Sequence, residues 1–570
     1  MKTLNLHVDY IKFKPLKKAL KSIGELSEKD KKEKEVKEAL VVLTAVEKWD
    51  SDIPSVVKEL VYNVKDIASQ VKVKNIVLYP YAHLSKDLGN PEMAQEILEK
   101  SDIALVKEGF KVTKAPFGYY KEFELKVKGH PLSELSREIR TTEIKGKESK
   151  EEVYDSKQLL REISKSKLDS SKLKDNDHRI IGRQMDLFSF SEVAPGMVFW
   201  HNNGLIIRNE LINFWREEHI KAGYKEISTP QIMDSKLWKI SGHWEKYKEN
   251  IFLTEYEKRS FAVKPMNCPG GMLVYKNSPK SYKDLPLRVG ELGIVHRQEL
   301  SGVLGGLFRV IQFTQDDAHI YCTEKQIEDE IFKVMDLVDL FYKKFGFEYS
   351  VELSTRPEKR IGSEKDWNMA ERILEEVLKE NKMKFRINEG DGAFYGPKID
   401  FYLKDSLGRT WQCGTIQLDF SMPERFELEY TDKDNSKKRP IMLHRTVLGS
   451  LERFIGVLLE HTNGRLPTWL SPVQVRVLSF TDRNVSYAEK VVEKMKKDIP
   501  FLRIETDFDQ KTVQAKVKDA EMMKIPWVII MGDKEEKDKT MSVRHENKVE
   551  YNVKVDDFIK SIKELIEERK

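Results

Sequence analysis

The chain has 570 residues, of which 40% are hydrophobic, and its 99 Lys and Arg residues nearly balance 94 Asp and Glu residues, giving a formal charge of +5. This length allows about three or four domains of ~150 residues each, and the near balance of charge excludes strong overall attraction to nucleic acid, so any RNA binding must use local patches. Three cysteines are too few for a disulfide framework, the start MKTLNLHVDY lacks the apolar core of a signal peptide, and no apolar run approaches the ~18 residues of a membrane span. We therefore expect a soluble, cytoplasmic protein.

Residues 1–140 are predicted to form a compact α/β or α+β domain. Short apolar strands are expected at 41–46 and 76–79, with a helical pattern at 56–71 between them. The second strand ends just before His83, which leaves this histidine on a loop at the strand's end. Functional residues often lie in such loops.

A change in composition separates this region from the rest of the chain. From 141 to 177 the sequence is rich in Lys, Ser, Glu and Asp, which predicts a linker that is partly helical around 157–163. The long region 178–470 is rich in aromatic residues and in strand and hairpin signals, with helices expected near 205–222 and 367–381.

The last hundred residues, 471–570, are predicted to form a small α/β domain with a mostly parallel sheet. No internal repeat is apparent, and no P-loop or GxGxxG signature opens a helix anywhere in the chain. A bound nucleotide would therefore have to lie on an antiparallel sheet. The C-terminal α/β domain is inferred from a different signal, the order strand, helix, strand, helix, strand at 473–480, 487–497, 501–506, 513–523 and 527–531.

The segment HRQELSGVLGGLFRVIQFTQDDAHIYC, residues 296–322, predicts a strand, a glycine loop and a second antiparallel strand that includes Phe308, Val310 and Ile311. In this arrangement two arginines can converge on one anion and an aromatic ring offers a flat face for a base. The alternative is a hairpin with solvated arginines, which is the commoner state of any single arginine. The side chains concerned are Arg297, Arg309 and Phe313, together with Gln315, Asp317 and His319, which share one face by their period of two.

Cys268, His319 and His444 are candidate metal ligands, but they are far apart in the sequence, so spacing alone favours packed, hydrogen-bonded side chains. Cys322 competes as a partner for His319. Residues three apart on a strand face opposite sides, so His319 and Cys322 cannot bind one ion there.

The 296–322 segment resembles motif 2 of class II aminoacyl-tRNA synthetases, and its TQDDAH is the form found in threonyl-tRNA synthetases. GYKEISTP, which ends at Pro230, resembles motif 1, and LHRTVLGSLERFIG at 443–456 resembles motif 3, where a helix carries Arg453. The resemblance covers nearly the whole chain. It implies a multidomain α+β and α/β protein with a class II antiparallel sheet core, an N-terminal deacylase-like editing domain and a C-terminal α/β anticodon-binding domain.

The resemblance also implies roles for single residues. Arg297 would hold the α-phosphate of ATP, Arg309 and Arg453 the phosphate tail with Mg²⁺, Phe313 would stack on adenine, and His243 would act in aminoacyl transfer. One zinc ion would be held by Cys268, His319 and His444 with an open coordination position. Cys413 is expected to be structural and to point away from Gln412. The remaining pocket residues are Glu299, Gln315, Asp317 (for the threonine ammonium), Tyr395, Lys398 and Gln412.

At the N-terminal end YPYAHLS, APFGYYKEF and KGHPLSEL resemble the archaeal editing domain of threonyl-tRNA synthetases, which implies an editing site made of His83, Tyr120, Lys121 and Glu134. The alternative is an RNA-positioning module without chemistry. At the C-terminal end GDKEEKDKTMSVR resembles an anticodon-binding domain, with base-reading residues at Glu535 and Arg544. Lys516 and Lys518 stand where the family pattern has KxR, and surface lysines are the alternative reading.

The expectation is a homodimeric threonine–tRNA ligase that uses ATP, L-threonine and tRNA(Thr), removes serine from mischarged tRNA, and binds neither DNA nor a membrane. The rivals are a seryl or prolyl enzyme and a catalytically silent RNA-binding or regulatory paralogue. Four residues depart from the family pattern and bear on contacts with the tRNA end: Gly271, Leu300, Ile311 and Gln312.

Overall fold

The computed structural model describes residues 1–20, 23–139, 157, 160, 173–546 and 548–570. Met1–Tyr154 and Asp155–Lys570 form two compact units, which are described separately. Most of the expected linker lies outside the described residues; within its expected helix around 157–163 only Lys157 and Leu160 are described, and both are helical. None of the described helices is both long enough and apolar enough to cross a membrane.

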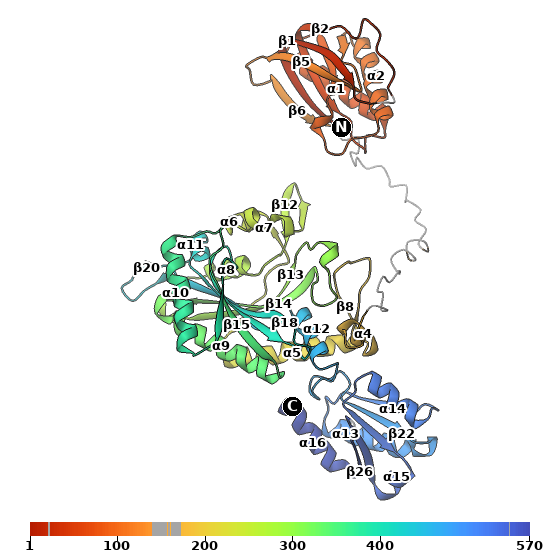
Figure 1. The fold of residues 1–570 in the computed structure, drawn as a ribbon, viewed down its shortest axis with the longest axis vertical. Helices are drawn as coiled ribbons and strands as arrows, with labels where there is room; N and C mark the ends of the chain where they lie inside the picture. Colours follow the sequence, from red (N-terminus) through yellow and green to blue (C-terminus); the bar gives the residue numbers. More distant parts are fainter. Residues whose placement is uncertain (21–22, 140–156, 158–159, 161–172, 547) are drawn as a thin grey trace. The chain divides into compact units, whose positions relative to one another are not determined.

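The first unit is a six-stranded sheet with two helices (Figure 1). Its strand order is β4-β3-β2-β1-β5, with β6 pairing to β1; β2, β3 and β4 are parallel, and β1 is antiparallel to its neighbours. The helix α1 begins where Asp52 accepts a hydrogen bond from Ser55 N, and it buries an apolar stripe against the sheet. The elements are β1 (Lys2–Lys18), β2 (Lys34–Ala45), α1 (Ile53–Gln70), β3 (Asn75–Pro80), η1 (Ala82–Leu84), α2 (Pro91–Lys107), β4 (Lys111–Lys114), β5 (Tyr119–Val127) and β6 (Glu134–Glu138).

The second unit is built on an eight-stranded sheet in the order β16-β15-β17-β18-β21-β14-β13-β9, in which only the edge strands β9 and β16 pair in parallel. The helices α5, α9, α10 and α12 contribute to one large apolar core with this sheet, which confirms the expected antiparallel core. The strands are β9 (Lys225–Glu226), β13 (Leu287–His296), β14 (Gln312–Cys322), β15 (Glu348–Ser354), β16 (Phe385–Asn388), β17 (Lys398–Lys404), β18 (Thr410–Asp419) and β21 (Ile441–Thr446); the helices are α5 (Asn202–Lys221), α9 (Ile327–Lys344), α10 (Glu364–Glu380) and α12 (Leu451–His461).

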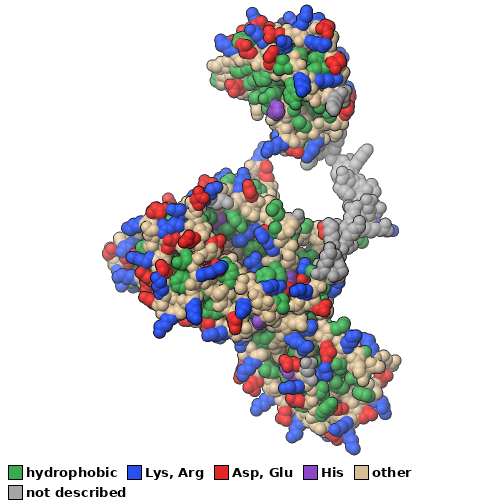
Figure 2. Space-filling model, viewed as in Figure 1, with side chains coloured by type: hydrophobic (Ala, Val, Ile, Leu, Met, Phe, Trp, Pro, Cys, Tyr) green, Lys and Arg blue, Asp and Glu red, His purple; other side chains and the backbone are tan. Residues whose placement is uncertain are grey.

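Smaller elements surround this sheet. The helix α4 (His178–Gln184) precedes it, and a three-stranded sheet with the short helices α6, α7 and α8 lies between β9 and β13 in the sequence. Lys and Arg side chains are interspersed with Asp and Glu over the face seen in Figure 2, as expected from the small net charge. The other elements are β7 (Phe188–Ser189), β8 (Phe199–Trp200), β10 (Ile232–Asp234), α6 (Lys236–Ile240), α7 (His243–Tyr247), β11 (Leu253–Tyr256), β12 (Arg259–Val263), α8 (Cys268–Lys276), α11 (Ser421–Arg425), β19 (Tyr430–Thr431) and β20 (Lys437–Lys438).

The C-terminal region has the predicted strand and helix order, and β22 pairs in parallel with both β23 and β24. Two antiparallel strands extend the sheet to the order β23-β22-β24-β25-β26. The elements are β22 (Val475–Ser479), α13 (Val485–Asp498), β23 (Ile504–Asp507), α14 (Val513–Met522), β24 (Trp527–Met531), α15 (Asp533–Asp538), β25 (Thr540–His545), β26 (Lys548–Lys554) and α16 (Val555–Glu567).

One element boundary was predicted wrongly. The strand β14 begins at Gln312, so Phe308, Val310 and Ile311 belong to the loop that joins β13 to β14. The alternation of apolar residues there has another cause. Phe308 packs on Trp411 with ring centroids 4.2 Å apart, and Ile311 N donates to Gly196 O, so both residues contact other parts of the chain, although Ile311 O still accepts from Arg297 N at 2.9 Å.

Candidate active site

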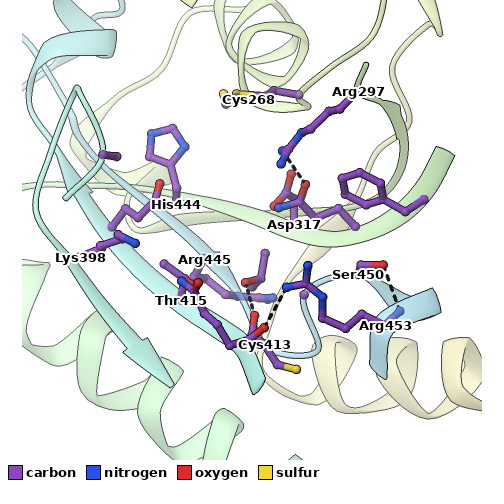
Figure 3. Close-up of a pocket in the computed structure, with 18 of the residues that line it drawn as sticks. Cys268, Arg297, Asp317, Lys398, Cys413, Thr415, His444, Arg445, Ser450 and Arg453 are labelled. Atoms are coloured by element: carbon purple, nitrogen blue, oxygen red, sulfur yellow. Dashed lines mark hydrogen bonds between the residues drawn. The ribbon is translucent and has the colours of Figure 1, made fainter. Parts of the chain in front are cut away.

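A cavity of about 660 Å³ lies against one face of the large sheet, where it is lined by residues of β14, β18 and β21. Figure 3 shows that its labelled side chains come from different elements, with Cys268, Arg297 and Asp317 on one side and Arg453 on α12 on another. The structure brings together thirteen of the residues singled out in the sequence: Cys268, Arg297, Glu299, Arg309, Phe313, Gln315, Asp317, His319, Tyr395, Lys398, Gln412, His444 and Arg453.

The candidate metal ligands converge. Cys268 is the first residue of α8, and His319 on β14 is the cross-strand partner of His444 on β21. All three are buried, and one ligand atom from each lies within 4.8 Å of the others. Among the described residues no hydrogen-bonding partner occupies the ring nitrogens of His319, whereas Asp419 Oδ2 lies 2.8 Å from His444 Nε2. Asp419 therefore orients His444 with Nδ1 free, as a carboxylate behind a ligating histidine does.

Burial sets the protonation of this group. It lowers the pKa of His319 well below its usual value, and it raises the pKa of the Cys268 thiol well above its usual value. The neutral imidazole of His319 can bind a cation, and a bound cation would itself favour the thiolate of Cys268. Three buried N and S donors suit a borderline-soft divalent ion such as Zn²⁺.

Among the described residues, neither Arg297 nor Arg453 of the cavity lining has a carboxylate partner. Arg297 Nε donates to Pro265 O at 3.2 Å, and Arg453 Nε donates to Phe308 O at 3.0 Å. Carbonyl oxygens orient a guanidinium without neutralising it, so both charges are available to an anion. Arg309 is paired with Glu299, with Nε 2.9 Å from Oε2.

Phe313 lies beside Arg297, whose guanidinium carbon is 5.1 Å from the ring centroid. Burial raises the pKa of the nearby Asp317 carboxyl to about 6, although Asn267 Nδ2 donates to it at 2.7 Å. An ionised carboxylate in this position can accept hydrogen bonds from an ammonium group. The cavity thus joins a metal-ligand set, a cation acceptor and an anion-binding end.

On the opposite wall Lys398 Nζ lies 2.9 Å from Asp400 Oδ2 and 3.1 Å from Asp391 Oδ2. Burial alone would lower the pKa of Lys398, but Asp400 and Asp391 outweigh it and the pKa is raised. Gln412 Nε2 donates to the other Asp400 oxygen at 2.7 Å, and the Tyr395 hydroxyl hydrogen-bonds Gln417.

Cys413 borders the cavity, but its side chain is part of the large apolar core, whereas Gln412 Nε2 reaches Asp400. A bulge between Phe401 and Tyr402, which face Gly414 and Gln412 respectively, leaves Cys413 without a cross-strand partner on β17. Burial raises the pKa of the Cys413 thiol to about 12, so it is an unreactive group.

His243 does not line the cavity. It is fully buried, its Nδ1 lies 2.7 Å from Ser241 Oγ, and its ring packs edge-on against Phe394, which does line the cavity. Burial lowers its pKa to about 3. The neutral ring is thus separated from the cavity by a phenylalanine.

Sequence reasoning missed the residues that hold the predicted ones in place, namely Asn267, Asp400 and Asp419. The sequence does not mark these residues, because strand pairing brings them to the site. Asp419, for example, lies on β18, which pairs with the strand β21 that carries His444. Only Asn267, directly before Cys268, could have been suspected from its neighbour.

A second cavity, of about 380 Å³, lies in the first unit. His83, Tyr120 and Lys121 line it, but Glu134 does not; Glu134 is exposed on β6, where it pairs with Leu6. Lys121 Nζ donates to Pro116 O at 2.8 Å and to Tyr119 O at 3.0 Å, and burial lowers its pKa to about 8.

In the C-terminal region both expected base-reading residues have partners within the chain. Glu535 accepts hydrogen bonds from Gly532 N and Ser542 Oγ, and Arg544 pairs with Glu521 at 2.5 Å. The alternative of a surface lysine is wrong for Lys516, which is buried because its Nζ donates to Ser479 O at 3.0 Å.

Comparison with known proteins agrees with this geometry. The archaea-specific editing domain of threonyl-tRNA synthetase matches residues 1–139, the class II tRNA synthetase core domain (G, H, P, S and T) matches 252–462, and the anticodon-binding domain matches 474–565. A solved structure described as the RNA binding domain of threonyl-tRNA synthetase from Cryptosporidium parvum is 40% identical with a TM-score of 0.66, and covers 68% of this chain and 98% of its own. This chain belongs to the threonyl-tRNA synthetase family.

Two further relatives support the assignment. The threonine–tRNA ligase of Caldanaerobacter subterraneus is 55% identical over 390 residues, which are 68% of this chain and 60% of that protein. The chain thus spans about three fifths of the length of the curated relatives it matches. A putative threonyl-tRNA synthetase structure from Aeropyrum pernix is 30% identical with a TM-score of 0.62, and covers 69% of this chain and 96% of its own.

The four departures from the family pattern lie outside the cavity lining. A Cβ added at Gly271 would lie 3.5 Å from His319 Nδ1, so a larger side chain would contact a candidate ligand. Leu300 is 79% exposed in the β13–β14 loop, which also contains Ile311 and is followed by Gln312 at the start of β14. Three of the differences therefore concern the loop and the start of β14, and the fourth lies on α8 behind His319.

Proposed function

We propose that this chain is a threonine–tRNA ligase that activates L-threonine with ATP and Mg²⁺, transfers it to tRNA(Thr), and hydrolyses seryl-tRNA(Thr). The single observation that carries the proposal is one cavity that combines the Cys268, His319 and His444 donor set with the unneutralised Arg297 and Arg453. We take 1–140, 141–177, 178–470 and 471–570 as the editing, linker, catalytic and anticodon-binding regions, and we expect a homodimer.

In the activation step a carboxylate oxygen of threonine attacks the α-phosphorus of ATP, the bond to the leaving pyrophosphate breaks, and threonyl-adenylate forms. Positioning and charge neutralisation are the main needs of such a reaction. Arg297 binds the α-phosphate, Arg309 and Arg453 bind the departing phosphates, Phe313 stacks on adenine, and Asp317 accepts the substrate ammonium. Lys398 supplies a further fixed positive charge, and Glu299, Gln315, Tyr395 and Gln412 complete the pocket.

The Cys268, His319 and His444 donor set fits zinc, because its atoms converge and His444 is oriented by Asp419. Zinc bound to three protein ligands would offer open positions to the amino and hydroxyl groups of threonine. Valine has no hydroxyl and would be rejected strongly, whereas serine differs by one methyl group, worth only ~1 to 3 kcal/mol. Serine is therefore the expected error.

The first unit is proposed to remove that error. Lys121 uses two of its three donors on Pro116 O and Tyr119 O, which leaves the third for the ester or a water in the cavity shared with His83 and Tyr120. Glu134 lies outside this cavity, so its role would depend on bound RNA. For Glu535 and Arg544 to read anticodon bases, their present partners must give way.

Aminoacylation with His243 as a participant would require Phe394 to move, since that ring separates His243 from the cavity. We therefore assign the proposed transfer step to the cavity as a whole and keep the role of His243 as a prediction for mutagenesis.

Amino-acid-dependent exchange between ATP and pyrophosphate, measured across the standard amino acids, tests the central claim. We expect threonine to give the fastest exchange, serine a weaker signal and valine none. No exchange with any amino acid would favour a silent RNA-binding paralogue, and faster exchange with serine or proline than with threonine would overturn the assigned substrate.

A further inference from the structure

The loop between β13 and β14 has two parts that differ in packing. An added Cβ at Gly302 or Gly305 would meet nothing within 4 Å, and Leu300 is 79% exposed. At Gly306, by contrast, φ is +56° and an added Cβ would lie 2.2 Å from His178 Nε2. The loop is therefore open around Gly302 and Gly305 and closely packed at its base, residues 306–308.

His178, the first residue of α4, holds this base. It is 1% exposed, and its Nδ1 lies 2.7 Å from Glu460 Oε1 on α12, while Leu307 N donates to its Nε2 at 2.9 Å. A backbone N–H can only donate, so Nε2 must be unprotonated and Nδ1 must carry the hydrogen. Both hydrogen bonds are made only by the neutral ring in this one tautomer.

The base of the loop leads directly to the cavity arginines. The Phe308 ring packs against His178 and Trp411, with centroids 4.2 Å away in each case. The carbonyl of Phe308 accepts from Arg453 Nε at 3.0 Å, and Arg309 is the next residue. His178 thus joins α4, the loop and α12 at the point where two cavity arginines are placed.

His178 also belongs to a cluster of possible metal ligands with Asp177 and Glu460. Each of these groups already has a partner. Asp177 accepts from Arg179, and the second Glu460 oxygen accepts from Arg409 at 2.5 Å. The cluster is a closed hydrogen-bond network and leaves no donor atom free for a metal ion.

We propose that His178 is a positioning residue that fixes the 306–308 base of the loop, so that Arg309 and Arg453 face the phosphates of ATP. The proposal rests on the proposed function. His178 lies outside residues 252–462, which match the synthetase core. The residue that holds the base of the loop therefore belongs to a segment that precedes that core. The threonine end of the cavity, around Cys268 and His444, makes no contact with His178 and should not depend on it.

The test compares full-length variants in threonine-dependent exchange and in hydrogen exchange of the loop peptide. His178→Phe keeps a ring against Phe308 but removes both hydrogen bonds, and His178→Gln retains an amide that can donate and accept. The control is His201→Phe: His201 also pairs with a carboxylate, Asp186, at 2.6 Å, but no hydrogen bond or ring contact joins it to the loop.

We expect His178→Phe to raise the KM for ATP about tenfold, because the loss of both hydrogen bonds loosens the part of the loop that positions Arg309 and Arg453. The KM for threonine should stay constant, the backbone at 299–308 should exchange faster, and His178→Gln should fall between this variant and the wild type. The His201→Phe control should change none of these values.

If His178→Phe changes neither the KM for ATP nor the hydrogen exchange of the loop, the proposal is overturned. Equal rises in the KM for ATP and threonine, together with a lower unfolding midpoint, would also overturn it, because they indicate general destabilisation. If His178→Phe does not fold, the same comparison is made with His178→Gln. An unchanged KM for ATP and unchanged hydrogen exchange of the loop in that variant would contradict the proposal. A wild-type chain that supports no exchange would refute the proposed function, while the hydrogen-exchange result would still decide the role of His178.

Discussion

Lys398 in the central cavity and Lys121 in the cavity of the first unit are both partly buried, yet their pKa values shift in opposite directions. For Lys398, burial is outweighed by Asp400 and Asp391, and the pKa is raised. For Lys121, burial acts without a carboxylate partner, its hydrogen bonds go to carbonyl oxygens, and the pKa falls to about 8.

The difference indicates two kinds of site. Lys398, Arg297 and Arg453 form a set of charges that persists across the whole working pH range, which suits a triphosphate and the charge that develops on its leaving group. Lys121 changes charge near neutral pH, and its cavity contains no second cation among the described residues that line it. Such a site suits a neutral ester better than a polyanion.

The largest expected effect is the loss of fixed charge from the central cavity. Arg297→Ala should lower threonine-dependent exchange by roughly 10² to 10³-fold, because it removes a preorganised cation from the reacting phosphate. Deacylation of preformed seryl-tRNA(Thr) by the first unit should be unaffected. Wild-type exchange in this variant would refute the role assigned to Arg297, and metal content and the unfolding midpoint serve as controls for folding.

The second expected effect concerns the metal. The wild type should contain about one zinc per chain, and His444→Ala should lose it, because two remaining protein ligands bind zinc weakly. His201→Ala, which removes a histidine paired with Asp186 away from the cavity, should keep its zinc. Full zinc retention in a folded His444→Ala protein, measured by metal analysis, would argue against the three-ligand site.

The third effect separates the two cavities. Lys121→Met should leave threonine activation near wild type and let seryl-tRNA(Thr) accumulate. Because only the ammonium form has a third donor to spare, the wild-type deacylation rate relative to Lys121→Met should be highest below pH 8 and should fall as the pH rises through about 8. A time course with the wild type, Lys121→Met and a truncation lacking residues 1–140 checks this; equal hydrolysis by all three would return the first unit to an RNA-positioning role.

The smallest effect is expected at the C-terminal region. Arg544→Ala should raise the KM for tRNA by about tenfold, in line with ~1 to 3 kcal/mol for one base contact, without changing threonine-dependent exchange. Lys563→Ala on α16 is the matched control, since among the described residues Lys563 pairs only with Glu567, which is exposed and lies in the same helix. Equal aminoacylation kinetics in the two variants would remove Arg544 from the base-reading role.

The local sequence pattern was sufficient to predict which way side chains point where the site residues lie on regular strands. The period of two placed Gln315, Asp317 and His319 on one face, because alternation is a property of every strand. It failed at Phe308 and Ile311, whose apolar character serves packing on Trp411 and a contact with Gly196. It also failed at Lys516, whose ammonium is buried against Ser479 by a tertiary contact.

The sequence by itself determined the order of the elements, the family resemblance and the residues that can carry the chemistry, because motifs and periodicity are local properties of the chain. Only the tertiary structure decided which of these residues meet. Cys268, His319 and His444 converge through the pairing of β14 with β21 and the position of α8, whereas His243 and Glu134 lie outside the two cavities. The physical reason is that strand register and helix packing depend on contacts between residues far apart in the sequence, and the same contacts set the burial that shifts the pKa of Lys121.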